Sequence, residues 1–533
     1  MQDLQSGRMA IKPLTPGPYW TSTCGKAPRP NSWGLVMQAA ESFGMRNFGG
    51  LVLGDKRRTD RLVESVDAMC RHPGGTLPDK FPKPADLKAF YRLMKCDSVT
   101  HEVLMRAHSD ETRHRIAALA ANATPNATPN ATPVVVLTLH DATELDYTTI
   151  KSLEHQLGQI GPGTRRGYIC HNSLAVRLIP DKDDGVIPET IGLLSQILHH
   201  RPRVKKGETA KEARERISRE SRLWVRGVQA CGPSPKGCLC VDVSDSLSDT
   251  FEYMAYEVNA GRRFLLRARE NRRLVEPLGE PLGEPAGAAS ENTPNPDYLF
   301  ETLRSLKSAG QREITVQTSP GRKARITTVH VAFSDVHIAK PGKKSGEYDN
   351  ESLDFWGVRV WEPNTPKDEE PLEWLLLTNC PVESLADAFE RIDWYGLRWI
   401  IEEYHKGMKT GCGIETLQLT STERIEPAIA VLSAVATTLL RLRDAARAPD
   451  ADTRAATEVV DRAYVEALAA FYPGRLKGTV TVLKFYMHVA RLGGHQNRKG
   501  DGLPGWLTLW RGWTKLESMV AGFTAAPKTC GQT

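Results

Sequence analysis

The N-terminal part of the chain has a helical pattern of apolar residues. Between residues 33 and 121 these residues recur at helical spacing, for example at Leu62, Val63 and Val66. The sequence Arg-His-Pro-Gly-Gly at residues 71–75 interrupts the pattern, because proline and adjacent glycines oppose helix formation. We therefore predict a helical region that contains a turn at this point.

The middle of the chain changes to a strand pattern. Short β-branched or alternating apolar runs predict strands at residues 134–139, 168–178, 237–243 and 312–338. The first run ends at His140-Asp141 and the third runs into Asp245, so each places an acid at the carboxyl end of a predicted strand. Helical spacing returns from about residue 382 to 448 and again at 453–492, before a Trp-rich terminal helix. This order predicts a multidomain α/β protein.

Composition excludes several classes of protein. With 40% hydrophobic and 25% charged residues, the chain of 533 residues matches an ordinary globular protein. Ten cysteines are too few for a disulfide scaffold, and residues 428–440, the longest apolar stretch, are too short to span a membrane. No apolar signal segment is visible in the first thirty residues, so we expect a cytoplasmic protein without a membrane partner. Two short repeats, at 122–133 and 276–285, predict surface loops.

Positive charge is concentrated in three clusters. The chain as a whole carries a net charge of only +6. Residues 201–226 contain ten basic and four acidic side chains, and residues 262–273 contain six arginines, among them Arg267. Lys56, Arg57 and Arg58 form a third cluster. A solvated helix face explains any one cluster equally well, but three clusters in different regions favour a long polyanion, and hence nucleic acid, as the partner.

The most informative segment is residues 395–409. If it is a continuous helix, Tyr395, Arg398, Glu402, Lys406 and Lys409 lie within an arc of about 80°. One interpretation is a surface helix with Arg–Glu–Lys ion pairs. The other is a carboxylate that binds a metal ion, surrounded by a tyrosine and cations that hold phosphates.

A single carboxylate is not enough for a catalytic divalent cation. Two-metal phosphoryl transfer requires acids from several elements around ions about 4 Å apart. Asp141 and Asp245 are the natural partners of Glu402, and this arrangement predicts a ribonuclease-H-like site. Asp242 and Asp249 compete with Asp245 for the role of second acid, and we prefer Asp245.

With these residues in this order, the chain resembles the cut-and-paste DDE transposases of the insertion-sequence-four group. The series Tyr395, Arg398, Glu402 and Lys406 matches the signature of that family, with Lys409 beyond it. Further similar segments are found along most of the chain, at 53–58 (LGDKRR), 72–78 (HPGGTLP), 374–378 (WLLLT) and 506–513. The first aspartate motif departs from the family in reading Asp-Ala-Thr, and Ser246 stands where an arginine usually follows the second aspartate.

The resemblance implies a domain organisation. It gives the α/β chain a ribonuclease-H-like catalytic core with a β-rich insertion, between a helical DNA-binding domain and a helical dimerisation domain. The expected boundaries are an N-terminal extension at 1–32, the DNA-binding domain at 33–121, the catalytic domain at 122–445 with its insertion at about 274–372, and the dimerisation region at 446–533.

The resemblance also implies roles for single residues. Asp141, Asp245 and Glu402 would bind two Mg²⁺ ions, for which Mn²⁺ would substitute. Tyr395, Arg398, Lys406 and Lys409 would hold the DNA strand that is cut, and Trp374 would stack on a flipped base during hairpin formation, unless it only packs in the core. The other expected DNA-binding residues are Lys56, Arg57, Arg58 and Arg267.

The expected partners are double-stranded DNA, as transposon ends and as target, and a second copy of the chain once the ends are paired. The tryptophans at 506–513 suit this dimer interface, although a helix that packs back on its own chain would explain them as well. Two alternative functions stay open. One is a catalytically silent descendant that acts as a DNA-binding repressor or inhibitor, and the other is a plain nuclease.

Overall fold

The computed structural model describes residues 9–10, 42–81, 83–123, 133–181, 185–201, 219–275, 298–316, 325–342, 348–367, 369, 371–498 and 503–525. The expected extension at 1–32 lies outside these residues, apart from 9–10. Most of both repeats and most of the basic cluster at 201–226 lie outside them as well.

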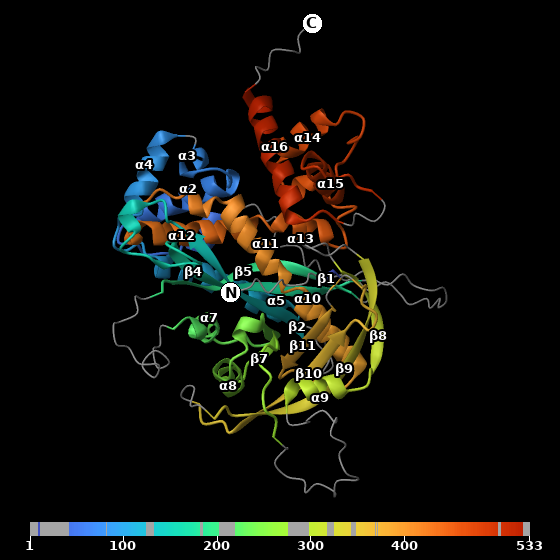
Figure 1. Ribbon diagram of the computed structural model, residues 1–533. Coiled ribbons are helices and arrows are strands. Elements are labelled where there is room, and N and C mark those ends of the chain that lie inside the picture. Colours follow the sequence, from blue (N-terminus) through green and yellow to red (C-terminus); the bar gives the residue numbers. More distant parts are fainter. Residues whose placement is uncertain are drawn as a thin grey trace, which may run out of the picture.

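A mixed sheet of eleven strands crosses the middle of the molecule (Figure 1). Its order is β1-β8-β9-β10-β11-β7-β6-β2-β4-β3, with β5 paired to the other edge of β4. The strands are β1 Met9–Ala10, β2 Val134–Asp146, β3 Gly158–Gln159, β4 Arg166–Pro180, β5 Val186–His199, β6 Cys238–Ser244, β7 Arg263–Arg267, β8 Gly310–Val316, β9 Arg325–Ala339, β10 Ser352–Trp361 and β11 Glu373–Thr378. Among these described strands, the pairs β2–β6 and β6–β7 are parallel and the others are antiparallel.

The predicted β-rich insertion extends this sheet instead of forming a sheet of its own. Strand β8 pairs antiparallel with β9, as the alternation at 312–338 predicted, and β9 pairs antiparallel with β10. β10 then pairs with β11, and β11 pairs with β7. The insertion is therefore continuous with the strands that carry Asp141 and Asp245.

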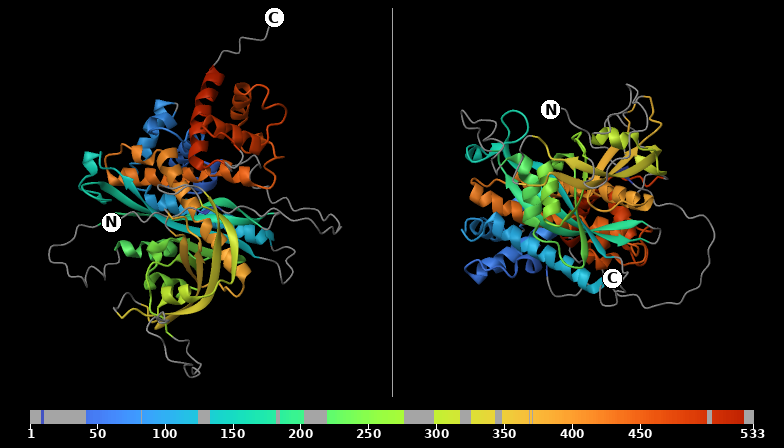
Figure 2. Two further views of the ribbon diagram at one scale, coloured as in Figure 1. Left: turned by 45° about the vertical axis from the view of Figure 1, so that its right-hand side comes forward. Right: turned by 90° about the horizontal axis from the view of Figure 1, so that it is seen from below.

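Helices cover both faces of the sheet. The helices are α1 Phe43–Phe48, α2 Lys56–Arg71, α3 Leu77–Lys80, α4 Pro84–Leu93, α5 His101–Ala123, α7 Leu223–Cys231, α8 Phe251–Asn259, α9 Leu299–Ser305, α10 Leu385–Gly396, α11 Trp399–Lys406, α12 Thr422–Thr438, α13 Arg441–Arg447, α14 Arg462–Phe471, α15 Val482–Leu492 and α16 Trp506–Ala525. The N-terminal helices and the C-terminal helices lie on the same side of the sheet (Figure 2). Helices α7, α8 and α9 lie on the other side (Figure 1).

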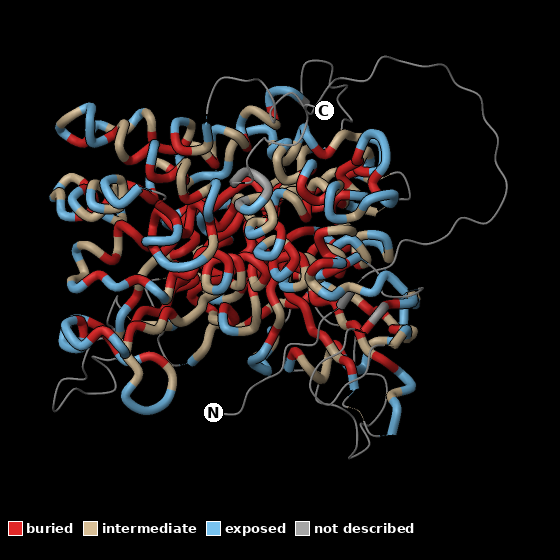
Figure 3. The backbone as a smooth tube through the Cα atoms, turned by 90° about the horizontal axis from the view of Figure 1, so that it is seen from above, coloured by how far each residue is buried: buried red, intermediate tan, exposed pale blue. Residues whose placement is uncertain are grey.

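The buried core is centred on the sheet and on α12. Figure 3 shows that the buried parts of the backbone gather in the centre of the molecule. Helix α12 packs against α2, α5 and β5. The segment Thr422–Arg447 is long and apolar enough for a membrane span. Its most apolar stretch of 18 residues has a mean hydropathy of 1.6, but 72% of that stretch is buried inside the protein. It is thus accounted for as a core helix.

Two sequence predictions about local structure are wrong. Strand β2 does not end before Asp141 but continues to Asp146, because residues 141–146 pair with residues 167–172 of β4. The segment 395–409 is not one continuous helix either. Tyr395 belongs to α10, Arg398 lies between α10 and α11, and Lys409 lies in a single π-helical turn at Gly407–Gly411.

The C-terminal tryptophans pack inside their own chain, as the alternative to a dimer interface predicted. Trp506 and Trp510 are buried, and their rings stack with centroids 5.6 Å apart. Trp513 stacks on Tyr464 of α14 at 4.9 Å. The apolar and aromatic character of this segment is therefore explained within one chain.

Candidate active site and nucleic-acid interface

Asp141, Asp245 and Glu402 come together from three different elements. Asp141 lies in β2, Asp245 directly follows β6, and Glu402 lies in α11, which packs on β2. Parallel pairing of β2 with β6 ends at His140 and Ser244, which places Asp141 level with Asp245, one residue further along the chain in each case. The side chains of Asp141 and Glu402 are 16% and 22% exposed, so solvent reaches both.

Arg398 lies at the centre of these acids. Its guanidinium is 2.9 Å from the Glu402 carboxylate and 3.5 Å from that of Asp141. Arg398 also forms a hydrogen bond with the Tyr395 side chain. The contact between residues 398 and 402 survives the helix break, because Arg398 keeps helical backbone angles.

The pKa values of Asp141 and Asp245 are raised at this site. Burial and the nearby Asp245 raise the pKa of Asp141 to about 7, with a smaller contribution from Glu402, although Arg398 opposes the rise. Burial also raises the pKa of Asp245, against the attraction of Arg398, Arg269 and Arg267. Arg398, together with Arg269 and Arg267 near Asp245, therefore offsets only part of the effect of burial and of the repulsion among the acids.

Asp242 and Asp249, the alternatives to Asp245 for the role of second acid, have different surroundings from Asp245. Asp242 is 1% exposed and binds His140 at 2.8 Å and Arg262 at 2.7 Å inside the core. Asp249 is 2% exposed, and it accepts hydrogen bonds from the backbone of residues 269 and 270 and from Arg272. Both carboxylates are bound to buried side chains or backbone groups, whereas Asp245 lies close enough to Asp141 to raise the pKa of Asp141.

The other residues of the predicted series have different surroundings. Lys406 lies over the ring of Trp399, with its Nζ 4.7 Å from the ring centroid. Lys409 pairs with Glu415 at 3.5 Å. Trp374 is buried in β11 with 4% of its surface exposed and contacts the Tyr395 ring edge-to-face at 5.6 Å. In this state Trp374 packs in the core, as the alternative interpretation predicted.

The arginine cluster at 262–273 is not one surface patch. Arg262 and Arg272 form buried ion pairs with Asp242 and Asp249. Burial raises the pKa of Asp245 and of Tyr395, and Arg267, by contrast with these two arginines, lies close enough to both to oppose that rise. Sequence reasoning missed Arg269, which acts on Asp245 in the same way. The available signal was the spacing of Arg269 two positions beyond Arg267, the last residue of β7, since residues two apart in an extended segment share one face.

The donor set of this site suits a hard divalent cation. Carboxylate oxygens are the ligands that Mg²⁺ prefers, and a cation would relieve the remaining repulsion among the acids. In the described parts of the chain no three His, Cys, Asp or Glu side chains are spaced as a ready metal cage. Arg398 contacts two of the carboxylates that would bind the ion, so the ion and Arg398 compete for Asp141 and Glu402.

A second candidate surface is the start of α2, where the basic cluster of residues 56–58 lies. Asp55 caps this helix through the amide of Arg57 at 2.9 Å. The side chains of Lys56 and Arg57 are 84% and 89% exposed and pair with Asp60 and Asp55. Arg58 instead donates to the carbonyl of Leu53 at 2.9 Å and so helps to fix the preceding loop. Arg58 is exposed as well, so a DNA backbone can reach Lys56, Arg57 and Arg58.

The turn at residues 73–75 connects this N-terminal region with the C-terminal helix. Lys80 is 1% exposed and donates to the carbonyls of Pro73, Gly74 and Gly75. A side chain added at Gly74 would meet Trp510 and Glu517 of α16. Burial raises the pKa of Glu517 to about 7 from an ordinary value of 4.5, against hydrogen bonding by Trp513 and attraction by Lys80.

This contact should depend on pH. Because the folded protein favours the protonated form of Glu517, its contribution to stability is present at low pH and is lost as pH rises from about 4.5 through 7. We expect Glu517→Gln to flatten the dependence of the melting temperature on pH between 5 and 8, and to melt higher than the wild type at pH 8. Circular dichroism of the full chain measures this. Glu466→Gln, at an exposed pair with Arg462, is the control and should keep the wild-type slope, and equal slopes for all three proteins would contradict the assignment.

A comparison with known protein families bears on the N-terminal region. Residues 40–99 match the family model described as transposase DNA-binding. The matched segment contains α1 to α4, the exposed cations of α2 and the turn held by Lys80. The chain therefore contains a transposase DNA-binding domain, and DNA is its partner.

Proposed function

We propose that this protein is a DNA transposase that binds transposon ends, cuts DNA strands and joins them to target DNA in a cut-and-paste reaction. The observation that carries the proposal is the convergence of Asp141, Asp245 and Glu402 around Arg398 in a chain that also holds a transposase DNA-binding domain. The strands β5-β4-β2-β6-β7, which carry Asp141 and lead into Asp245, are the proposed ribonuclease-H-like core.

In this proposal each residue of the site has a distinct task. Asp141, Asp245 and Glu402 would hold two Mg²⁺ ions, or Mn²⁺ in their place. When bound, these ions would supply the Lewis acid that activates a water or a 3′-hydroxyl and neutralises charge on the phosphate. Arg398 and Tyr395 would position the scissile phosphate, and Arg267 and Arg269 would supply the positive charge that Ser246 does not.

Three further parts of the proposal rest on the family resemblance alone. Lys406 and Lys409 would hold the transferred strand once DNA competes for their present contacts. Trp374 would stack on a flipped base during hairpin formation, which requires it to leave its contact with Tyr395. A homodimer formed through the C-terminal region at 446–533 would pair the two ends. The proposed location is the bacterial cytoplasm, at the nucleoid.

DNA binding through α2 should be electrostatic. Each phosphate contact contributes about 0.9 to the slope of log affinity against log salt concentration. We expect Lys56→Ala and Arg57→Ala each to weaken binding of the transposon end and to reduce this slope by about 0.9. Fluorescence anisotropy at several salt concentrations measures it. Arg462→Ala is the control, since Arg462 of α14 is 82% exposed but lies outside both the matched segment and the expected DNA-binding domain at 33–121, and it should keep the slope.

A cleavage assay separates the proposed function from its alternatives. We expect the full chain with Mg²⁺ to nick DNA that carries the inverted repeats flanking its gene, and EDTA to stop the reaction. A silent repressor would bind the same DNA and leave it uncut with either Mg²⁺ or Mn²⁺. A plain nuclease would cut unrelated DNA at the same rate.

A further inference from the structure

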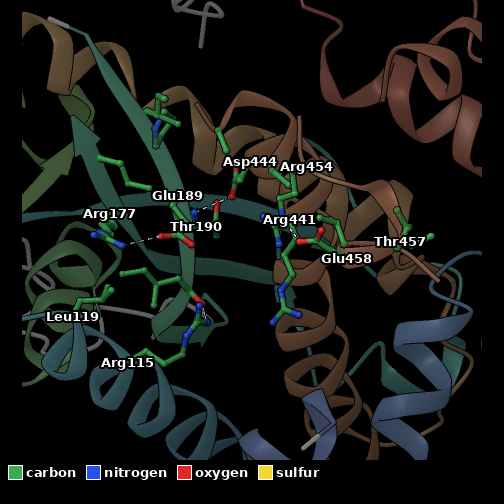
Figure 4. A pocket seen from close by; sticks show the side chains of 18 of the residues that line it. Arg115, Leu119, Arg177, Glu189, Thr190, Arg441, Asp444, Arg454, Thr457 and Glu458 are labelled. Atoms are coloured by element: carbon green, nitrogen blue, oxygen red, sulfur yellow. Dashed lines mark hydrogen bonds and ion pairs between the residues drawn. The ribbon is translucent and has the colours of Figure 1, made fainter. Parts of the chain in front are cut away.

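A cavity of about 590 Å³ lies where the N-terminal helices, the sheet and the C-terminal segment meet. Arg115 of α5 and Arg441 of α13 point into it (Figure 4), and Arg46 of α1 also lines it. Six arginines and four carboxylates line the cavity in total. Its charged lining therefore has an excess of positive charge.

The cavity is separate from the candidate active site. Arg177, which lines the cavity, lies five residues along β4 from Asn172, the residue that pairs with Asp141. At about 3.4 Å per residue, this places the two sites about 17 Å apart along the strand. No part of the proposed transposition chemistry uses the cavity.

The carboxylates of the lining already have partners. Their partners are Arg177 for Glu189, Arg454 for Glu458, Arg443 and the Thr190 amide for Asp444, and the Ala463 amide for Asp461. Consequently these acids do little to balance the arginines that face the cavity from α5 and α13.

Arg441 is the least compensated of these arginines. Among the described residues no carboxylate lies within ion-pair distance of it, and its guanidinium rests on the ring of Phe43 at 5.2 Å. Burial, together with repulsion from Arg115 and Arg46, lowers the pKa of Arg441 to about 10. Arg115 donates to the carbonyl of Ile191, and burial lowers its pKa as well. An anion between these side chains would relieve their repulsion.

The walls of the cavity restrict the kind of anion. Leu119, Ile187 and Ile191 line one side, and Ala445 and Val459 line another. The volume lies in the range of small-molecule sites, which combine apolar walls with a few charged groups. Inorganic phosphate alone would fill little of it. Arginine binds phosphate in a bidentate manner, so a phosphate on an apolar or ring-shaped body matches this lining.

We propose that this cavity binds a phosphate-bearing ligand of the size of a mononucleotide, with the phosphate held by Arg46, Arg115 and Arg441 and the ring body against the apolar walls. Two sources share this chemistry, namely a free nucleotide and the terminal nucleotide of a DNA strand. The site is independent of the proposed cleavage chemistry and is expected even in a catalytically silent protein.

The test uses the full chain and isothermal titration calorimetry with dAMP, deoxyadenosine and a 5′-phosphorylated single-stranded tetranucleotide. We expect dAMP to bind and deoxyadenosine not to bind. Arg441→Gln and Arg115→Gln should each weaken dAMP binding at least about tenfold, since each removes a charge-assisted contact. Arg441→Gln should also raise the melting temperature of the free protein, because it removes charge repulsion; this also shows that the variant folds. Arg462→Gln is the control, because Arg462 lies at the cavity, is 82% exposed and pairs with Glu466.

The outcomes decide the proposal and the source. Tetranucleotide binding at least tenfold tighter than dAMP, and lost in Arg441→Gln, identifies a strand end as the ligand. Equal or weaker tetranucleotide binding identifies a free nucleotide. The proposal is overturned if no phosphate probe binds at millimolar concentration, or if Arg441→Gln and Arg462→Gln bind the phosphate probes equally.

Discussion

Asp141→Asn, Asp245→Asn and Glu402→Gln should each abolish nicking of the transposon end while end binding stays within about twofold of the wild type. Each change removes the negative charge of one of three converging carboxylates and keeps the size of the side chain. Losing a metal ligand removes several kcal/mol of transition-state stabilisation, which corresponds to at least about a hundredfold in rate. DNA binding should persist because the acids lie outside residues 40–99.

Single-turnover cleavage and gel-shift assays on the same preparations measure both effects. Asp354→Asn is the control and should cut at the wild-type rate, because Asp354 is 79% exposed and its ion-pair partner among the described residues is His337. Burial raises the pKa of Asp141 and Asp245, and repulsion from Asp245 adds to the rise at Asp141, so Asp141→Asn and Asp245→Asn should melt no lower than the wild type. A variant of Asp245 that still cuts would remove this residue from the site.

The sequence predicted the convergence of the acids better than it predicted the helix that carries Glu402. Asp141 and Asp245 follow apolar runs that become parallel neighbours, so their proximity follows from strand pairing alone. The prediction of one continuous helix at 395–409 was wrong. The spacing of apolar residues does not reveal where the backbone hydrogen bonding of a helix is interrupted or changes to the π-helical pattern. Arg398 reaches Glu402 and Asp141 from a break between two helices, and Lys409 turns toward Glu415 in a π-helical turn.

The surroundings of the C-terminal tryptophans and of the arginines at 262–273 depend on tertiary packing, which composition does not reveal. The sequence favoured a dimer interface for the tryptophans of α16 and left packing within the chain as the alternative, and the stacking of Trp513 on Tyr464 and of Trp506 on Trp510 shows that intrachain packing is present. The arginines of 262–273 were counted as one cluster, although adjacent positions in and after a strand face opposite sides. Arg262 consequently enters the core, while Arg267 and Arg269 lie near Asp245.

The same packing argument leads to an expected loss of stability in Asp242→Ala. Burial alone would raise the pKa of Asp242, but Arg262 and His140 hold it below its ordinary value, so the carboxylate is charged in the core. Its removal leaves Arg262, 9% exposed, and fully buried His140 without their shared partner. Breaking a buried pair in this way costs about 3–5 kcal/mol.

Urea unfolding of the full chain measures this cost, with Asp354→Ala as the control at an exposed aspartate–histidine pair worth about 0–1 kcal/mol. The conservative change Asp242→Asn sharpens the distinction from a metal ligand. Because it keeps the shape and part of the hydrogen bonding to His140, we expect reduced stability together with nicking, per folded molecule, close to the wild-type rate. A stable Asp242→Asn protein that cannot nick would instead place Asp242 among the metal-binding acids and remove Asp245 from that role.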